Sequence, residues 1–264
     1  YTKRAGRSTL ILTSNGSSLN KAEHVDNYFG FSKGVSGKEL LESGLEQVKR
    51  LGCEVVECQA TRLEPGSPFI VHTNKGKFEG KTVLIATGAS RAKRAGLNLD
   101  EFEGRGVSYC ATCDGFFFRD KPVAVLGGGD YAAAEASELA HFASSVTALT
   151  DGAPQADFGS IKVLETKPAR LVGSDTLEKI EFEDGTSIAV DGLFVAIGVA
   201  SALDFARSAG IITGPSAIEV DEKMQTSIPG VFAAGDCVGG LLQVSKAVGE
   251  GALAGTGMIA ALRG

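Results

Sequence analysis

Cys110 and Cys113 are separated by two residues, and Asp114 follows directly. Thiols at this spacing can cycle between dithiol and disulfide, and thiolate chemistry needs a neighbouring group that moves protons. Asp114 is therefore a candidate general acid and base. An equally good local interpretation makes Asp114 a turn residue before Gly115. The cysteine pair predicts redox chemistry.

The other cysteines and the histidines do not extend this pair into a metal site. The chain holds five cysteines, and an odd number does not suit a disulfide framework. A structural zinc site usually needs a second close pair or two histidines at finger spacing. The three histidines lie far apart in the sequence, so we expect no metal site. Cys53 and Cys58 are interpreted as small core residues.

A glycine-rich turn follows the apolar run at residues 122–126. Gly127, Gly129 and Ala132 fit a turn that lets the backbone approach a pyrophosphate at a helix N-terminus, and Asp130 stands where that helix begins. This context predicts a Rossmann-type dinucleotide site. The alternative is a glycine-rich turn that binds nothing.

Asp151 bears on which dinucleotide such a site would take. In a Rossmann unit, the residue at the end of the next strand contacts the ribose, and that strand here ends at Thr150 and Asp151. A carboxylate accepts a hydrogen bond from a 2′-hydroxyl but repels a 2′-phosphate. No arginine or lysine occurs from Glu135 through Gly159. If the turn binds a nicotinamide cofactor, Asp151 favours NADH over NADPH.

A third candidate site is Gly235 and Asp236, which follow the apolar run at residues 231–234. The carboxylate of Asp236 could hold a ribityl or ribose hydroxyl, with the N-terminus of the following helix near a phosphate. The alternative is an aspartate that caps a helix. The sequence leaves both interpretations open.

The elements that must position these residues alternate between strand and helix, which predicts the α/β class. Short apolar runs predict buried strands, and periodic apolar positions predict amphipathic helices. The expected strands lie at residues 9–13, 69–73, 77–79, 83–88, 122–126, 145–150, 177–183, 187–190, 193–197 and 231–234, and the expected helices lie at 38–51, from 130 to 141, and from about 243 to 262. Residues 151–160 are too short and too interrupted by glycine and proline for a full crossover helix.

Composition excludes several other classes of function. The chain has 264 residues, 43% hydrophobic and 22% charged, and a net charge of −6, which argues against a broad nucleic-acid surface. It contains no run of about 18 apolar residues that would cross a membrane. The first residues do not have the shape of a signal peptide, so we expect a cytoplasmic location. The 35 glycines gather between apolar runs and indicate loops that approach a ligand.

Several segments together resemble the low-molecular-weight thioredoxin reductases, which are flavoprotein disulfide reductases. They are residues 109–117 (YCATCDGFF), 125–130 (VLGGGD) and 226–236 (TSIPGVFAAGD). Residues 25–31 (VDNYFGF), which include Asn27, and 85–89 (IATGA) also match that family's flavin domain. The resemblance covers nearly the whole chain, and the CATCD string is specific to the family.

The resemblance implies two Rossmann-like three-layer α/β domains. The chain ends, residues 1–105 and 199–264, would form an FAD-binding domain, and residues 106–198 would form an inserted, reduced pyridine-nucleotide-type domain that carries the cysteine pair. Family members work as homodimers, so a homodimer is expected here.

The resemblance also implies a route for electrons from reduced FAD to a Cys110–Cys113 disulfide and then to thioredoxin. Cys113 would face the flavin, Cys110 would attack the disulfide of thioredoxin, and Asp114 would be the acid and base. The expected residues around FAD are Asn27, Thr87, Gly88, Gly235, Asp236, Gln243 and Val244.

Three departures from the family pattern concern the cofactors. The family's first strand and its pyrophosphate turn for FAD are missing, so we expect an N-terminally incomplete sequence. The basic cluster that grips the 2′-phosphate of NADPH is replaced by residues 148–151. Tyr131 replaces a small residue and is expected to crowd a nicotinamide.

The electron donor therefore has alternatives. Residues 234–237 (AGDC) and 246–251 (KAVGEG) are similar to the flavin-containing thioredoxin reductases that take electrons from ferredoxin. The retained glycine turn favours a pyridine nucleotide instead. The sequence predicts a thioredoxin reductase with ferredoxin or NADH as donor. The alternatives are an NADPH-dependent reductase and a redox-inactive binding remnant that lacks FAD.

Overall fold

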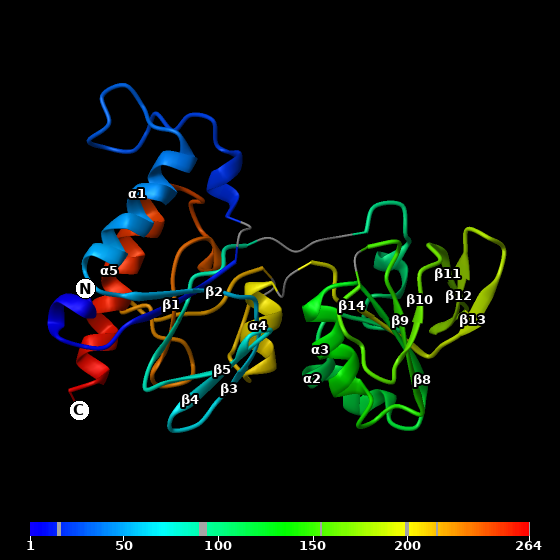
Figure 1. Ribbon diagram of the computed structural model, residues 1–264. Coiled ribbons are helices and arrows are strands. Elements are labelled where there is room, and N and C mark those ends of the chain that lie inside the picture. The colour runs from blue at the N-terminus through cyan, green and yellow to red at the C-terminus, as the bar shows by residue number, and fades with distance from the viewer. Residues whose placement is uncertain (15–16, 90–93, 154, 199–200, 215, 264) are drawn as a thin grey trace. The chain divides into compact units, whose positions relative to one another are not determined.

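The computed structural model describes residues 1–14, 17–89, 94–153, 155–198, 201–214 and 216–263, without the side chains of Ser18, Lys21 and Cys113. The chain forms two compact units (Figure 1). Unit 1 comprises Tyr1–Ala89 and Ile211–Gly264, and unit 2 comprises Ser90–Gly210. Each unit is described by itself below. No helix in the described part of the chain has the length and apolar character needed to cross a membrane.

Unit 1 contains two pairs of parallel strands. Strand β1 (Leu10–Thr13) pairs with β2 (Glu54–Glu57), and β6 (Val83–Ile85) pairs with β15 (Val231–Ala233). The second pair joins the two chain segments of the unit, because β6 and β15 come from opposite ends of the sequence. Strand β6 is shorter than the run expected at residues 83–88, so Thr87 and Gly88 lie beyond its carboxyl end.

A three-stranded antiparallel meander completes the strands of unit 1. It consists of β3 (Ala60–Glu64), β4 (Phe69–Thr73) and β5 (Gly76–Gly80), in that order. The strands expected at residues 69–73 and 77–79 are confirmed and pair with each other, whereas β3 was not predicted.

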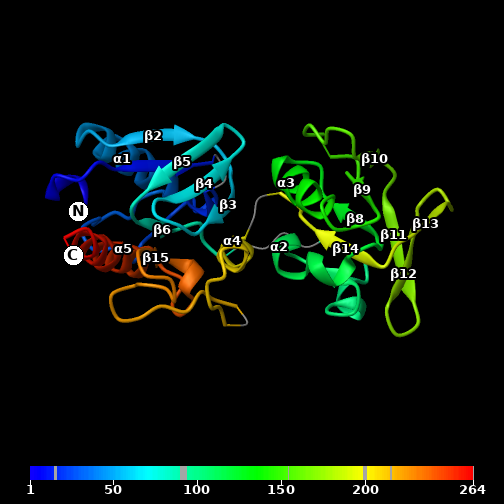
Figure 2. The same ribbon diagram turned by 90° about the horizontal axis from the view of Figure 1, so that it is seen from below.

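Unit 1 contains two long helices, and the first has clear start and stop signals in its sequence. Helix α1 (Gly37–Arg50) starts with a capping box in which Ser36 and Glu39 satisfy each other's backbone N–H groups, and ends before Gly52, whose φ is 80°. Helix α5 (Val244–Ala261) packs its buried Ala254 against Phe232 of β15. Figure 2 shows α5 running beside β15.

Unit 2 is built on a five-stranded parallel sheet with the strand order β10-β9-β8-β14-β7. The strands are β7 (Val107–Ser108), β8 (Pro122–Leu126), β9 (Ser145–Leu149), β10 (Lys162–Leu164) and β14 (Gly192–Val195). The residues of β8 from Val123 onward and all of β14 are buried, as expected for strands covered on both faces.

A second antiparallel meander packs its apolar side chains into the core of unit 2. It consists of β11 (Pro168–Gly173), β12 (Leu177–Phe182) and β13 (Ser187–Ala189). The core cluster includes Leu171, Ile180 and Leu193. The strands expected at residues 177–183 and 187–190 are confirmed as β12 and β13, and β11 and β10 were not predicted. Residues 150–161 connect β9 to β10 with no helix in their described part.

The remaining helices of unit 2 are α2 (Ala111–Asp114), α3 (Asp130–Leu139) and α4 (Ala202–Ser208). Helix α3 lies where the sequence predicts it, directly after the glycine turn, whereas α4 was not predicted.

Short 3₁₀ turns occur in both units, at η1 (Lys3–Ala5), η2 (Ser18–Lys21), η3 (Leu99–Phe102), η4 (Gly115–Phe118) and η5 (Asp236–Val238). The strand order and the βαβ connection confirm the expected α/β class.

Candidate functional site

Cys110 lies in unit 2 between the end of β7 and the start of α2. It is disulfide-bonded and only 5% exposed. The side chain of Cys113 is outside the described part of the structure, so the Cys110–Cys113 pairing stays a prediction. Cys53, Cys58 and Cys237 are free thiols.

Asp114, the last residue of α2, is tied to the backbone of Cys110 through Ser108. The Ser108 hydroxyl donates to Asp114 Oδ2 over 2.6 Å, and the Cys110 N–H donates to Ser108 Oγ over 3.2 Å. The Asp114 N–H donates to the Cys110 carbonyl over 3.1 Å. The carboxyl group of Asp114 thus belongs to a hydrogen-bonded chain that ends on the backbone N–H of Cys110.

A second carboxylate, that of Glu135, contacts the N-terminus of α2. Glu135 of α3 is 8% exposed and accepts a hydrogen bond of 2.6 Å from the Ala111 N–H at Oε2. Burial, with smaller contributions from Asp204 and Glu138, raises the pKa of Glu135 to about 7. Sequence reasoning missed this residue.

The sequence did hold a signal for Glu135. It occupies the same helical face as Ala132, Ala136 and Leu139, all of which are completely buried. A carboxylate on the apolar face of a helix needs a polar partner, because an unpaired buried charge is costly.

The glycine turn at Gly127 packs closely against other parts of unit 2. Gly127 has a φ of 150°, and a Cβ there would lie 2.2 Å from the Ala196 carbonyl and 3.0 Å from the Ala132 side chain. Gly129 is the N-cap of α3, and Asp130 is its first residue. The Gly128 carbonyl accepts a hydrogen bond from the Ala156 N–H over 2.8 Å, which ties the segment after β9 to the turn.

Asp151 follows β9 as predicted, but its carboxylate is already paired. Arg94 Nη2 donates to Asp151 Oδ1 over 3.1 Å, and Arg94 Nε lies 2.5 Å from Oδ2. The backbone of Asp151 is left-handed, with a φ of 54°. The sequence suggested that no basic residue accompanies Asp151, because Arg94 lies far away along the chain.

Tyr131 was expected from the sequence to crowd a nicotinamide. It is buried in unit 2, and its hydroxyl donates to the Tyr109 carbonyl over 3.1 Å. It offers a ligand almost no surface in this structure and instead anchors the segment that leads into Cys110.

In unit 1, two charged residues of α5 hold the turn at Gly235. The Gly235 N–H donates to Glu250 Oε2 over 2.8 Å, and Lys246 Nζ donates to the Gly235 carbonyl over 3.0 Å and to the Gly239 carbonyl. Lys246 and Glu250 form an ion pair of 3.1 Å. The φ of 85° and ψ of −152° at Gly235 are accessible chiefly to glycine, so this residue type allows the turn and the two side chains fix it.

Asp236 is the first residue of η5, with Gly235 as the N-cap and no side-chain cap. The interpretation of Asp236 as a capping residue is therefore wrong. Its carboxylate has no hydrogen-bond partner in the described part of the chain and remains available to a ligand. Next to it, burial raises the pKa of the Cys237 thiol to about 11, and this thiol donates to the Ile85 and Ala234 carbonyls.

Residues from both segments of unit 1 meet at the start of α5. The side-chain amide of Asn27 donates to Gln243 Oε1 over 2.6 Å, and Gln243 is the N-cap of α5, directly before Val244. Gly88 has a φ of 78°, and the space where its Cβ would lie is open. Thr87 is exposed.

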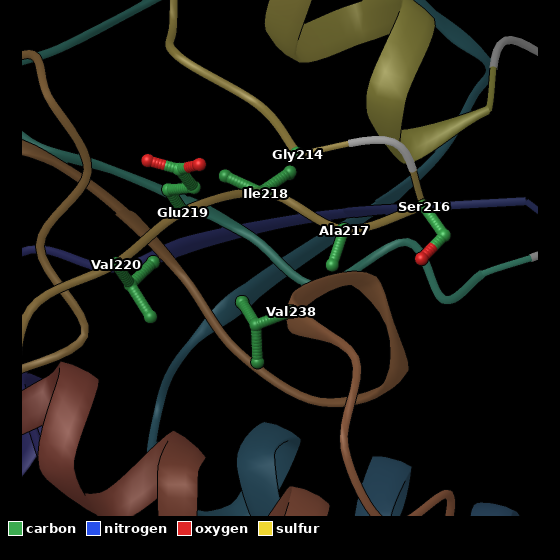
Figure 3. Close-up of a pocket in the computed structure, with 7 residues that line it drawn as sticks. All are labelled: Gly214, Ser216, Ala217, Ile218, Glu219, Val220 and Val238. Carbon is green, nitrogen blue, oxygen red and sulfur yellow. The ribbon is translucent and has the colours of Figure 1, made fainter.

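A pocket of about 470 Å³ lies beside η5 in unit 1. Figure 3 shows its lining, which is mostly apolar and includes Ile218, Val220 and Val238, with Glu219 as the charged member. None of the site residues predicted from the sequence lines it.

The comparisons with known proteins agree on one family. A family model described as pyridine nucleotide-disulphide oxidoreductase matches residues 6–155 and 159–251. The thioredoxin reductase of Aquifex aeolicus is 36% identical over 257 residues, which cover 89% of this chain and 80% of that protein.

Two solved structures add detail. The atypical thioredoxin reductase TRi from Desulfovibrio vulgaris Hildenborough matches with a TM-score of 0.92 and 39% identity, over 100% of this chain and 92% of that one. A ferredoxin-flavin thioredoxin reductase from Clostridium acetobutylicum matches with a TM-score of 0.68 and 31% identity, over 96% and 89% of the two chains. The family model, the sequence identities and the shared fold together show that this chain belongs to the thioredoxin reductase family of FAD-dependent pyridine nucleotide-disulphide oxidoreductases.

Proposed function

We propose that this protein reduces thioredoxin with the dithiol form of Cys110 and Cys113, and that FAD reduces the resulting Cys110–Cys113 disulfide again. The observation that carries this proposal is the chain of hydrogen bonds from Asp114 through Ser108 to the backbone of Cys110. It supports the proposal because it links a carboxyl group, which can transfer protons, to the backbone of the cysteine that we expect to attack.

The residues of unit 1 fit FAD. The open space at Gly88 and the left-handed backbone at Gly235 leave room for a ligand to reach the main chain. The unpaired carboxylate of Asp236 suits a hydroxyl group, and Asn27 and Gln243 present amide groups at the start of α5. We assign FAD binding to unit 1, with Thr87 and Val244 as further contacts, and the redox disulfide to unit 2. When bound, FAD supplies the electron pair that opens the disulfide.

The chain's own residues then carry out exchange with thioredoxin. Cys110 passes its thiol proton to Asp114 and attacks the thioredoxin disulfide. A bond forms between the Cys110 sulfur and one thioredoxin sulfur, the thioredoxin disulfide breaks, and the leaving sulfur takes the proton back from Asp114. Cys113 then loses its thiol proton to Asp114 and attacks the Cys110 sulfur, the mixed disulfide breaks, and the second thioredoxin sulfur takes that proton, so thioredoxin leaves as a dithiol. Two electrons leave the enzyme, and its disulfide is restored.

Exposed aromatic rings support thioredoxin as the protein partner. Phe116 and Phe117 follow α2 directly and are 66% and 70% exposed. Arg119 lies over the Phe116 ring at 5.3 Å. Large exposed apolar side chains beside a redox centre suit the docking of another protein. We also propose that the protein is a homodimer, which sedimentation can test.

For the electron donor, we propose ferredoxin or NADH, with NADPH as the alternative. The ferredoxin option is supported by the likeness to the ferredoxin-flavin enzyme. The pyridine-nucleotide options are supported by the turn at Gly127, Gly129 and Asp130, with Asp151 as the ribose contact. The flavin spectrum of the purified holoenzyme, followed during addition of each donor in turn, decides among them.

Trapping the exchange intermediate tests the proposed function independently of the donor. A Cys113→Ser variant, reduced chemically and mixed with thioredoxin, should accumulate a disulfide between Cys110 and thioredoxin. Failure of this variant to form such a disulfide, while the protein retains its flavin, would overturn the proposal.

A further inference from the structure

The strongest feature outside the expected mechanism is the contact between Glu135 and the helix that carries the cysteine pair. Glu135 lies on the buried face of α3, and its Oε2 accepts from the Ala111 N–H over 2.6 Å. Helices α2 and α3 pack against each other within unit 2. This contact lies inside the same unit as the redox disulfide.

Ala111 is both the first residue of α2 and the neighbour of Cys110. The first N–H groups of a helix have no acceptor within the helix, so a buried helix start needs another partner. Glu135 supplies it. A buried carboxyl group therefore lies one peptide unit from the disulfide-bonded cysteine.

We propose that Glu135 is a positioning residue of the redox centre, which holds the backbone at Cys110 and controls how readily the reduced Cys110 becomes a thiolate. This inference rests on the proposed role of Cys110 in exchange with thioredoxin. The established family membership does not by itself assign any role to Glu135.

The physical reason is repulsion between like charges in a buried place. When the Cys110 thiol loses its proton, its sulfur gains a negative charge, and the carboxyl group of Glu135 is bonded to the N–H of the next residue. An ionised Glu135 opposes that charge, whereas a protonated Glu135 does not. Because burial raises its pKa to about 7, both forms of Glu135 are present near neutral pH.

The surroundings of Glu135 do not offer a compensating cation from the strands. Strands β8 and β9, which pack against α3, contribute no titratable side chain. Besides Cys110 and Glu135 themselves, the titratable or charged groups on α2, on α3 and on α4, which packs against α2, are Cys113, Asp114, Asp130, Tyr131, Glu138, Asp204 and Arg207. Carboxylates dominate this set, so the negative charge of Glu135 adds to an acidic environment.

The test is the pH dependence of Cys110 alkylation in the reduced holoenzyme. Iodoacetamide reacts with the thiolate, so its rate at each pH reports the thiol pKa, and peptide mass spectrometry assigns the rate to Cys110. Glu135→Gln keeps an acceptor for the Ala111 N–H and removes the charge. We expect a lower thiol pKa of Cys110 and alkylation about three- to tenfold faster at neutral pH.

Two controls separate charge from structure. Glu138→Gln removes the same charge from the next turn of α3 without touching Ala111 and should shift the thiol pKa clearly less. Glu135→Asp keeps the charge and should leave the thiol pKa near that of the wild type. An unchanged thiol pKa in Glu135→Gln, or an equal shift in Glu138→Gln, would overturn the inference.

A second measurement covers the case in which Glu135→Gln does not fold. Infrared difference spectra of the wild-type holoenzyme, taken near neutral pH between its disulfide and dithiol forms, should show a gain in protonated carboxyl signal on reduction. No change in that signal would contradict the inference. Neither measurement uses thioredoxin, so a failure here is distinguishable from a failure of the proposed function.

Discussion

The side chains of Asn27 and Gln243 are joined by a hydrogen bond of 2.6 Å, although 216 positions separate them in the sequence. The bond connects the loop before α1 with the first turn of α5. It brings together two residues that resemblance had assigned separately to the flavin site. The bond thus joins the two chain segments that make up unit 1.

Replacing Asn27 should weaken flavin binding. Asn27→Ala removes the donor to Gln243 and leaves the start of α5 without this tie. We expect flavin to dissociate about threefold to tenfold more readily, which corresponds to the loss of one hydrogen bond. Flavin fluorescence released on dilution measures this. Equal flavin retention in the variant and the wild type would contradict the assignment.

The ion pair between Lys246 and Glu250 should stabilise unit 1 more than an exposed pair of the same spacing. Lys246→Met breaks bonds to the Gly235 and Gly239 carbonyls and leaves Glu250 without its cation. We expect a loss of about 1–3 kcal/mol in the free energy of unfolding.

The chain offers a matched control for that prediction. Lys38 and Glu42 are also four residues apart, but their 3.9 Å pair is exposed. Lys38→Met should change the free energy of unfolding by less than about 0.5 kcal/mol. Chemical denaturation of both variants should separate them, and equal losses would show that the Lys246 contacts add nothing specific.

Gly127 should tolerate no side chain. Gly127→Ala places a Cβ 2.2 Å from the Ala196 carbonyl, at a φ of 150°. We expect a loss of about 1–3 kcal/mol in stability. Gly129→Ala is the control, because the nearest atom to its Cβ is the Gly198 carbonyl at 3.7 Å. Thermal unfolding measures the melting temperature of each variant. Equal melting temperatures for Gly127→Ala and Gly129→Ala would contradict this expectation.

Arg94 should limit the use of NADH if the glycine turn binds it. Arg94→Gln frees the Asp151 carboxylate to accept from a ribose hydroxyl, so flavin reduction by NADH should become about two- to tenfold faster. Lys162→Gln, which removes a positive charge from the neighbouring strand β10, should not change it. Stopped-flow absorbance of the flavin measures both rates. A slower reaction in Arg94→Gln would mean that Arg94 assists the donor.

The buried Glu135 should make stability fall as pH rises. Its folded-state pKa of about 7 lies above the ordinary value of 4.5, so the folded protein binds the proton more tightly than the unfolded chain. The stability that this proton contributes is present below pH 4.5 and is lost as the pH rises toward 7. Denaturation across this range should show a steeper decline for the wild type than for Glu135→Gln, and parallel curves would contradict the shift.

Local patterns in the sequence predicted most of unit 2's sheet, because strands buried on both faces read as continuous apolar runs. They missed β7 and β10, which have too few residues to show a period, and α4, whose buried face of Ala202, Phe205 and Ala206 spans little more than one turn. The hydrogen bond from Ala111 to Glu135 and the pair of Arg94 with Asp151 depend on tertiary contacts. No spacing along the chain reveals them.

The proposed function requires that Cys110 and Cys113 together reduce thioredoxin and are oxidised to a disulfide. The most direct measurement is a single turnover in which chemically reduced holoenzyme is mixed with oxidised thioredoxin, and thioredoxin thiols are counted. Cys110→Ser and Cys113→Ser should each abolish the release of reduced thioredoxin, whereas Cys53→Ser, which alters a free thiol of unit 1, should leave it intact. Undiminished release of reduced thioredoxin by either of the first two variants would contradict the account.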